Sequence, residues 1–205
     1  MNKKTLRDVD LKGKRVVMRV DFNVPIKEGV IKDDTRIKGA LASIKYVLEN
    51  GGSLVLMSHL GRPAEKGYEA DFSLKPVAEY LSKMLGKPVV FAADCANADK
   101  EVAAMKPGDI VMLENTRFYA EEQGKVKKKE GMTDDEYKAK KAEMKEKQLK
   151  LAEKLASYGD IYCNDAFGTA HRAHASMVAA AKEKPAAMGR LMEEEVKALE
   201  GALSN

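Results

Sequence analysis

Residues 14–25 read KRVVMRVDFNVP, an apolar run that changes abruptly into polar residues. Within the run only Arg19 interrupts a series of valines and a methionine, so both faces of an extended chain would be apolar here. Unbroken apolar strands of this kind are typical of a parallel sheet that is buried on both faces. The stretch therefore predicts a buried strand whose carboxyl end carries Asp21 and Asn23.

Further apolar runs alternate with helical patterns along the rest of the chain. The runs cover residues 53–58, 88–93, 109–115 and 160–164, and the helical patterns cover 36–50, 73–85, 98–106 and 133–158. Strand followed by helix, repeated several times, indicates an α/β fold. We therefore predict a three-layer, Rossmann-like domain in which helices cover both faces of a parallel sheet.

Composition limits the classes of protein to which the chain can belong. It has 205 residues, of which 44% are apolar, enough for one large domain with a real core. No apolar run is long enough to span a membrane, and the first residues lack the apolar centre of a signal peptide. Two cysteines without a short motif indicate a reducing compartment. We expect a cytoplasmic monomer with no membrane partner.

The formal net charge of +4 arises in one segment. Residues 124–150 hold ten lysines and six acidic residues, which leaves the rest of the chain balanced. Thr133 and Glu136 have the spacing of a capping box, so a helix is predicted over 133–158. Its Lys, Glu and Ala positions are typical of a solvated outer helix, and we expect no nucleic-acid partner. Steep salt-dependent binding to duplex DNA would support the opposite view.

Charged and polar residues recur at the ends of the predicted strands. Ligands of open α/β sheets bind beyond the carboxyl ends of the strands, so these residues are the candidate site. The chain has 28 lysines but only eight arginines, and four of the arginines lie at strand ends or at the start of a helix. The planar guanidinium suits phosphate and carboxylate, which predicts a small polyanionic ligand. The candidate side chains are Asp21, Asn23, Arg36, His59, Arg62, Arg117, His171 and Arg172.

Simpler explanations exist for each of these residues. A single loop arginine is usually part of a surface ion pair, and Asp21 and Asn23 could be ordinary turn residues. His171 and His174 could bind a metal, but no third ligand has suitable spacing and the nearby arginines would repel a cation. No G-x-S-x-G nucleophile elbow is present. Arg19, inside an apolar strand, is expected to form a buried ion pair rather than a ligand contact.

Seven stretches of the chain together resemble the N-terminal half of phosphoglycerate kinase. They occur in the order of that family and cover nearly the whole length: RVDFNVP (19–25), DDTRI (33–37), LMSHLGRP (56–63), LKPVAEYLS (74–82), LENTRFY (113–119), NDAFGTAHRAHASMV (164–178) and LMEEEVKAL (191–199). The family transfers a phosphoryl group between 1,3-bisphosphoglycerate and ADP, giving 3-phosphoglycerate and ATP, with magnesium. Its N-terminal half binds the glycerate, and its C-terminal half binds the nucleotide.

The resemblance implies a role for each candidate residue. Asp21 and Asn23 would hold the glycerate hydroxyl, and Arg36 would act in catalysis by steadying the transferred phosphoryl group. The grip on the non-reacting phosphate would come from His59, Arg62, Arg117 and Arg172. His171 would line the same basic patch, with His174 as a supporting member.

The resemblance also implies a domain plan. Residues 1–190 would form the substrate domain, with a Lys-rich helical insertion at 124–150, and residues 191–205 would form a hinge helix. The C-terminal nucleotide domain is expected to be absent from this chain. Mg-ATP or Mg-ADP would serve the full enzyme without binding here, and the isolated chain would bind 3-phosphoglycerate without turnover. The alternative is a non-catalytic anion-binding domain, or an engineered folding model, derived from the family.

Overall fold

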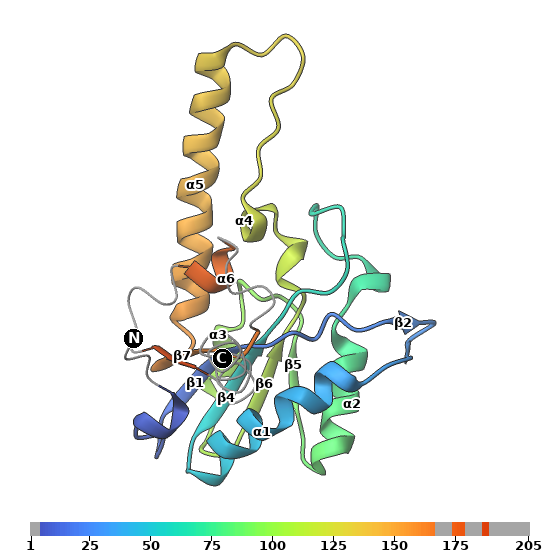
Figure 1. The fold of residues 1–205 in the computed structure, drawn as a ribbon, viewed down its shortest axis with the longest axis vertical. Helices are drawn as coiled ribbons and strands as arrows, with labels where there is room; N and C mark the ends of the chain where they lie inside the picture. Colours follow the sequence, from blue (N-terminus) through green and yellow to red (C-terminus); the bar gives the residue numbers. More distant parts are fainter. Residues whose placement is uncertain (1–4, 167–173, 179–185, 189–205) are drawn as a thin grey trace, which may run out of the picture.

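A computed structural model describes residues 5–166, 174–178 and 186–188, and its centre is a parallel sheet (Figure 1). The strand order is β5-β6-β4-β1-β7-β8, and every neighbouring pair is parallel. The strands are β1 (Arg15–Arg19), β4 (Ser53–Met57), β5 (Val90–Ala92), β6 (Ile110–Leu113), β7 (Ile161–Asn164) and β8 (Ala186–Met188). All five strands predicted from the apolar runs are confirmed.

Successive residues of β1 pack into two separate cores. Val17 lies opposite Val55 of β4 and Tyr162 of β7, and all three side chains belong to one core. Val16 and Met18 belong to the core on the other face. Alternation along a strand thus buries both faces, which is why the sequence of β1 is apolar at consecutive positions.

Helices cover both faces of the sheet, so the predicted three-layer α/β fold is confirmed. One core contains the apolar side of α1 (Thr35–Glu49) and of α2 (Lys75–Leu85). The other core contains residues of α3 (Asp99–Ala103), α5 (Asp134–Ala156) and α6 (Ala175–Val178). Tyr158 joins this second layer to the loop after β5, since its hydroxyl donates to the Cys95 carbonyl at 2.7 Å.

Short elements escaped the sequence patterns. β2 (Ile26–Lys27) and β3 (Val30–Ile31) form a hairpin whose turn residues, Glu28 and Gly29, both have positive φ. Also missed were β8, α4 (Ala120–Gln123), α6 and three 3-10 turns, η1 (Leu6–Asp8), η2 (Ala70–Phe72) and η3 (Thr116–Phe118). Two to four residues are too few for a period of 2.0 or 3.6 to be visible in the sequence.

The segment 124–150 and the helix that it enters form a projecting arm (Figure 1). The chain leaves α4 at Gly124, extends away from the sheet and returns along α5. The predicted cap is present in part, because the Thr133 hydroxyl accepts from the Glu136 N–H at 3.1 Å. Only the last turns of α5, from Leu151 onward, are buried against the domain.

Two further sequence predictions concern the hinge helix and membrane-spanning segments. The predicted hinge helix, residues 191–205, lies outside the described residues, as does the end of the predicted 1–190 domain. Among the helices that the structure describes, none combines the length and the hydropathy needed to cross a bilayer.

The start of α1, which carries Arg36, is fixed by two acidic residues. Asp33 accepts hydrogen bonds from the Thr35 N–H at 2.9 Å and from its hydroxyl at 2.6 Å. Asp34 accepts from the Tyr80 hydroxyl of α2 at 2.6 Å. The Tyr80 hydrogen bond holds the pKa of the Asp34 carboxyl below its usual value of 3.8. Each contact stabilises the ionised carboxylate.

We predict that Tyr80→Phe lowers the free energy of unfolding at pH 7 and that this difference shrinks in acid. Because the pKa of Asp34 is lower in the folded chain, its contribution is fully present above the unfolded value of 3.8. The contribution is lost as the pH falls through the folded pKa. Urea unfolding of both proteins at pH 7 and pH 3 measures the difference. An equal difference at both pH values would contradict the role of the Asp34 charge.

Candidate functional site

The strands whose ends carry the candidate residues are neighbours in the sheet. β6, β4, β1 and β7 lie side by side, and all run in the same direction. The residues after their last positions therefore meet at one edge. This is the edge at which open α/β sheets bind ligands.

Arg36 joins the start of α1 to the loop that follows β1. Its Nη1 donates to Asp21 Oδ1 at 3.3 Å and to the Asn23 carbonyl at 2.6 Å. Asp21 Oδ1 also accepts from the backbone N–H of Asn23 at 3.1 Å, which closes a tight turn. The Arg36 side chain is about half exposed, at 53%, so this ion pair lies at the surface of the edge. The loop after β1 thus contributes a carboxylate and a backbone carbonyl, and both contact the arginine at the start of α1.

Gly61 connects that loop to the loops after β4 and β6. Its N–H donates to Asn23 Oδ1 at 2.8 Å, and its carbonyl accepts from Arg117 Nη1 at 3.1 Å. Asn23 follows β1, Gly61 follows β4 and Arg117 follows β6, so one residue in the middle links three strand ends. Arg117 is buried, and Arg62, the next residue after Gly61, is exposed.

Asn115 holds two of these loops together, and the sequence analysis did not single it out as a functional residue. Its Oδ1 accepts from the N–H of Leu60 at 3.1 Å and of Arg117 at 3.0 Å. Its Nδ2 donates to the carbonyls of Leu60, at 2.7 Å, and of Phe72, at 2.9 Å. The side chain is buried, and its place directly after an apolar strand, two residues before Arg117, is the signal in the sequence.

The ring of His59 is held in place by a hydrogen bond from Arg19. Arg19 is fully buried and donates to Ser176 Oγ at 3.0 Å and to the Val20 carbonyl at 2.5 Å. Its Nη2 lies 2.9 Å from Nδ1 of His59. A guanidinium has only donors, so Nδ1 must accept, and the ring proton resides on Nε2. Arg19, which the sequence suggested as part of a buried ion pair, thus orients a candidate ligand residue.

The structure brings together most of the predicted site residues that it describes. Asp21, Asn23, Arg36 and Arg117 are linked through Gly61, as described above, and Arg62 follows that glycine. His59 lies buried two residues before it and is held by Arg19. His171 and Arg172 lie outside the described residues, whereas His174 is described and buried.

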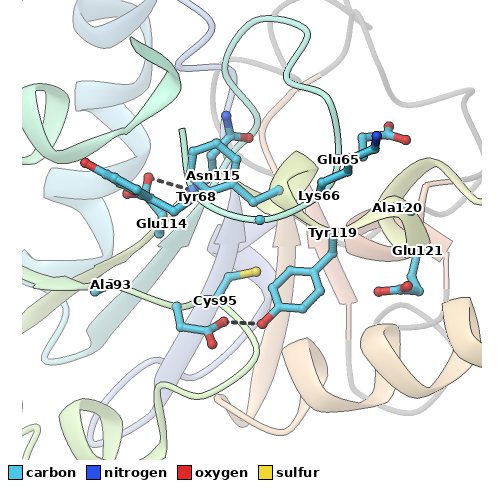
Figure 2. Close-up of a pocket in the computed structure, with 13 residues that line it drawn as sticks. Glu65, Lys66, Tyr68, Ala93, Cys95, Glu114, Asn115, Tyr119, Ala120 and Glu121 are labelled. Carbon is cyan, nitrogen blue, oxygen red and sulfur yellow. Dashed lines mark hydrogen bonds between the residues drawn. The ribbon is translucent and has the colours of Figure 1, made fainter. Parts of the chain in front are cut away.

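A cavity beside this cluster has different chemistry. It measures about 380 Å³ and is lined by acidic and aromatic side chains, among them Glu65, Tyr68, Asp94, Tyr119 and Glu121. The Tyr119 hydroxyl donates to Asp94 Oδ1 at 2.5 Å. A dashed line from Tyr119 marks this hydrogen bond in Figure 2. Carboxylates on its wall would repel a phosphate, so the candidate anion site is the cluster around Gly61 and not this cavity.

Both cysteines are buried. Burial raises the pKa of the Cys95 thiol, and it does the same for Cys163. A thiol with a raised pKa is a poor nucleophile. Among the described residues, no three His, Cys, Asp or Glu side chains gather as they would around a metal ion.

Comparison with known proteins agrees with the sequence resemblance. A family model described as "Phosphoglycerate kinase" matches residues 6–205. The chain belongs to the phosphoglycerate kinase family. Curated members named "Phosphoglycerate kinase" from Dictyoglomus turgidum and Fervidobacterium nodosum are 48% and 49% identical over the whole of this chain.

The relatives that match this chain are longer than it is. The alignments cover 47% of the Dictyoglomus protein and 46% of the Fervidobacterium protein. A solved phosphoglycerate kinase from Coxiella burnetii matches with a TM-score of 0.78 and 36% identity, over 98% of this chain and 45% of that one. The chain thus spans about half the length of the curated relatives it matches.

Gly61 is predicted to be intolerant of any side chain. It has φ +63°, and a Cβ added there would lie 2.5 Å from the ring of Phe72. Gly61→Ala therefore combines backbone strain with a clash inside the loop that joins Asn23 and Arg117. Gly86→Ala is the matched control, since Gly86 has φ +65° and nothing within 4 Å of its added Cβ.

We expect Gly86→Ala to cost about 1–2 kcal/mol of unfolding free energy through strain alone. Gly61→Ala should cost roughly 1–3 kcal/mol more, because the Phe72 ring must move. Urea unfolding of the two variants beside the unmodified chain gives both numbers. Equal losses of unfolding free energy at the two positions would show that the clash with Phe72 adds no cost, which would contradict the prediction.

Proposed function

We propose that this chain forms the 3-phosphoglycerate-binding half of a phosphoglycerate kinase active site. The reaction would transfer a phosphoryl group between 1,3-bisphosphoglycerate and ADP, giving 3-phosphoglycerate and ATP. In this proposal residues 1–190 form the substrate domain, 191–205 connect it to a nucleotide-binding domain, and the assembled enzyme is a monomer. Family membership is the starting point, and the geometry at the sheet edge supports the placement of the substrate.

The observation that carries the proposal is the junction at Gly61. Arg117 donates directly to the Gly61 carbonyl. Arg36 is linked to Gly61 through Asn23, whose carbonyl accepts from Arg36 and whose side-chain oxygen accepts from the Gly61 N–H. Isolated surface arginines would have no reason to share one hydrogen-bonded junction. Convergence of guanidinium groups on one edge favours an anionic ligand of small size.

The loop after β1 offers the groups that an alcohol needs. In each of the two side chains one polar atom is already hydrogen-bonded: Oδ1 of Asp21 and Oδ1 of Asn23. The second polar atom, Oδ2 of Asp21 or Nδ2 of Asn23, makes no hydrogen bond to the described residues. A carboxylate oxygen can accept a hydrogen bond from an alcohol O–H, and an amide N–H can donate a hydrogen bond to the alcohol oxygen. We therefore assign these two residues to the C2 hydroxyl of 3-phosphoglycerate.

The basic residues around the junction are assigned to the two ends of the substrate. Arg62 and Arg117, with His59 behind them, would bind the non-reacting phosphate. The resemblance adds His171 and Arg172, which lie outside the described residues. Arg36, half exposed at the helix start, would lie over the reacting carboxyl group. Arginine suits both tasks because its planar fork binds phosphate and carboxylate in pairs of hydrogen bonds.

This division of labour needs no general base. In the ATP-consuming direction the acceptor is a carboxylate, which is already ionised at neutral pH. Catalysis then depends on holding two anions in line and on neutralising charge in the transition state. Arg36 would supply that positive charge from this chain.

The nucleotide and its magnesium ion are assigned to a second domain, as the family resemblance implies. The described residues would bind only 3-phosphoglycerate, whose carboxylate accepts the phosphoryl group. On this basis the 205-residue chain, mixed with Mg-ATP and 3-phosphoglycerate, forms no 1,3-bisphosphoglycerate until a nucleotide-binding half is supplied.

Calorimetric titration with 3-phosphoglycerate tests the binding proposal. The unmodified chain should give saturable heat, and Arg62→Ala should weaken the affinity by about 10- to 100-fold, since a hydrogen-bonded charge is lost. Arg62→Lys should fall between them because it keeps the charge and loses the fork.

Arg7→Ala is the matched control for that titration. Arg7 belongs to η1, which precedes β1, and its removal changes the net charge by the same amount. The control should bind as the unmodified chain does. A flat trace for the unmodified chain, or equal weakening by Arg7→Ala, would overturn the proposed binding site.

A further inference from the structure

The arm contains a groove that the proposed substrate site does not use. It lies between the segment 125–132 and the middle of α5, at residues 140–147, and its volume is about 290 Å³. Figure 1 shows the arm projecting away from the sheet. No described residue of the proposed substrate site lines the groove. Lysines and apolar residues make up most of its wall: Lys125, Lys127, Lys129, Lys140, Val126, Met132 and Met144.

The charges around the groove are not balanced within the arm. Within residues 124–150 three ion pairs form, and they engage Lys128 with Asp134, Lys147 with Glu143 at 3.2 Å and Lys150 with Glu146 at 3.7 Å. The four lysines named above as lining the groove make no ion pair with the described residues. Glu143 is the only carboxylate in the described wall, and Lys147 already engages it. Grouped like charges repel, so an anionic partner would be favoured here.

The floor of the groove is apolar. Val126, Met132 and Met144 are half-buried and line the same hollow as the lysines. Methionine is flexible and polarisable, and it adapts to apolar groups of different shapes. A volume of about 290 Å³ has room for one or two aliphatic side chains. The groove thus combines an apolar pocket with a cationic rim.

Contacts inside the arm hold the groove open in the free chain. The Tyr137 hydroxyl donates to the Val126 carbonyl at 3.2 Å, which ties the returning helix to the outgoing segment. Gln148 Nε2 donates to the Glu122 carbonyl at 3.3 Å at the base of the arm. Lys141 lies over the Tyr137 ring, 4.4 Å from its centre. A preformed groove lowers the cost of ordering a partner.

We propose that this groove binds an acidic segment of a partner protein, with an apolar side chain of the segment seated on the methionines. Carboxylates on either side of that anchor would meet the four lysines. A nucleic acid fits less well, because the described wall has no aromatic ring on which a base would stack. An anionic membrane also fits less well, because acidic residues such as Glu136, Glu143 and Glu146 share the exposed helix.

Fluorescence anisotropy with a labelled peptide tests this proposal. The probe is a twelve-residue peptide of glutamates with two central leucines. It should bind the 205-residue chain saturably, and the affinity should fall by about tenfold or more when four groove lysines become glutamine. This groove variant is Lys125→Gln, Lys127→Gln, Lys129→Gln and Lys140→Gln.

A matched variant controls for charge alone. It removes four lysines that belong to the same arm and do not line the groove: Lys128→Gln, Lys138→Gln, Lys145→Gln and Lys150→Gln. We expect its affinity for the peptide to stay within about twofold of the unmodified chain. Met144→Ser should weaken binding, and a peptide with serines in place of both leucines should bind more weakly as well. Circular dichroism of each variant establishes that the helix content is unchanged.

Three results would overturn the proposal. One is equal weakening by the groove variant and the matched variant, which would indicate diffuse charge attraction. Another is equal binding of the leucine and serine peptides, which would leave the apolar floor without a role. The third is tighter groove-dependent binding of a 20-base-pair duplex RNA, or of phosphatidylserine vesicles, than of the peptide.

Discussion

The side-chain amide of Asn115 is the point on which the geometry of the site depends. It makes four hydrogen bonds, which fix the N–H and the carbonyl of Leu60, the N–H of Arg117 and the carbonyl of Phe72. All of these groups are inside the protein or at its edge, where an unmade hydrogen bond is expensive. The loop after β4 and the loop after β6 therefore have one relative position, and Gly61 lies where both Asn23 and Arg117 can reach it.

The remaining basic residues divide into fixed and exposed groups around that junction. Arg19 and Arg117 are buried and held by hydrogen bonds, so they keep their positive charges at constant positions. Arg36, at the start of α1, and Arg62, in the loop after β4, are exposed. A site that neutralises an anion needs both properties. Preorganised charge avoids reorganisation during reaction, and accessible charge meets the substrate.

Much of this arrangement could be predicted from the sequence, for identifiable reasons. Apolar runs revealed the five longer strands, and the rule for strand ends placed Asp21, Asn23, His59 and Arg117 at one edge. The roles of Asn115 and Arg19 could not be predicted, because each depends on partners far away in the chain, such as Leu60 for Asn115 and Ser176 for Arg19. The hairpin β2–β3 and the strand β8 were missed because two or three residues carry no readable period.

Nuclear magnetic resonance of the ¹⁵N-labelled chain during addition of 3-phosphoglycerate measures the central claim most directly. The backbone amides of Asn23, Gly61 and Arg117 should shift together and saturate at one ligand concentration, because one junction joins them. The amides of Lys138 and Lys145 in the arm should not move. Shifts confined to the arm or to the acidic cavity, or no saturable shift at Gly61, would contradict a substrate site at the ends of β1, β4 and β6.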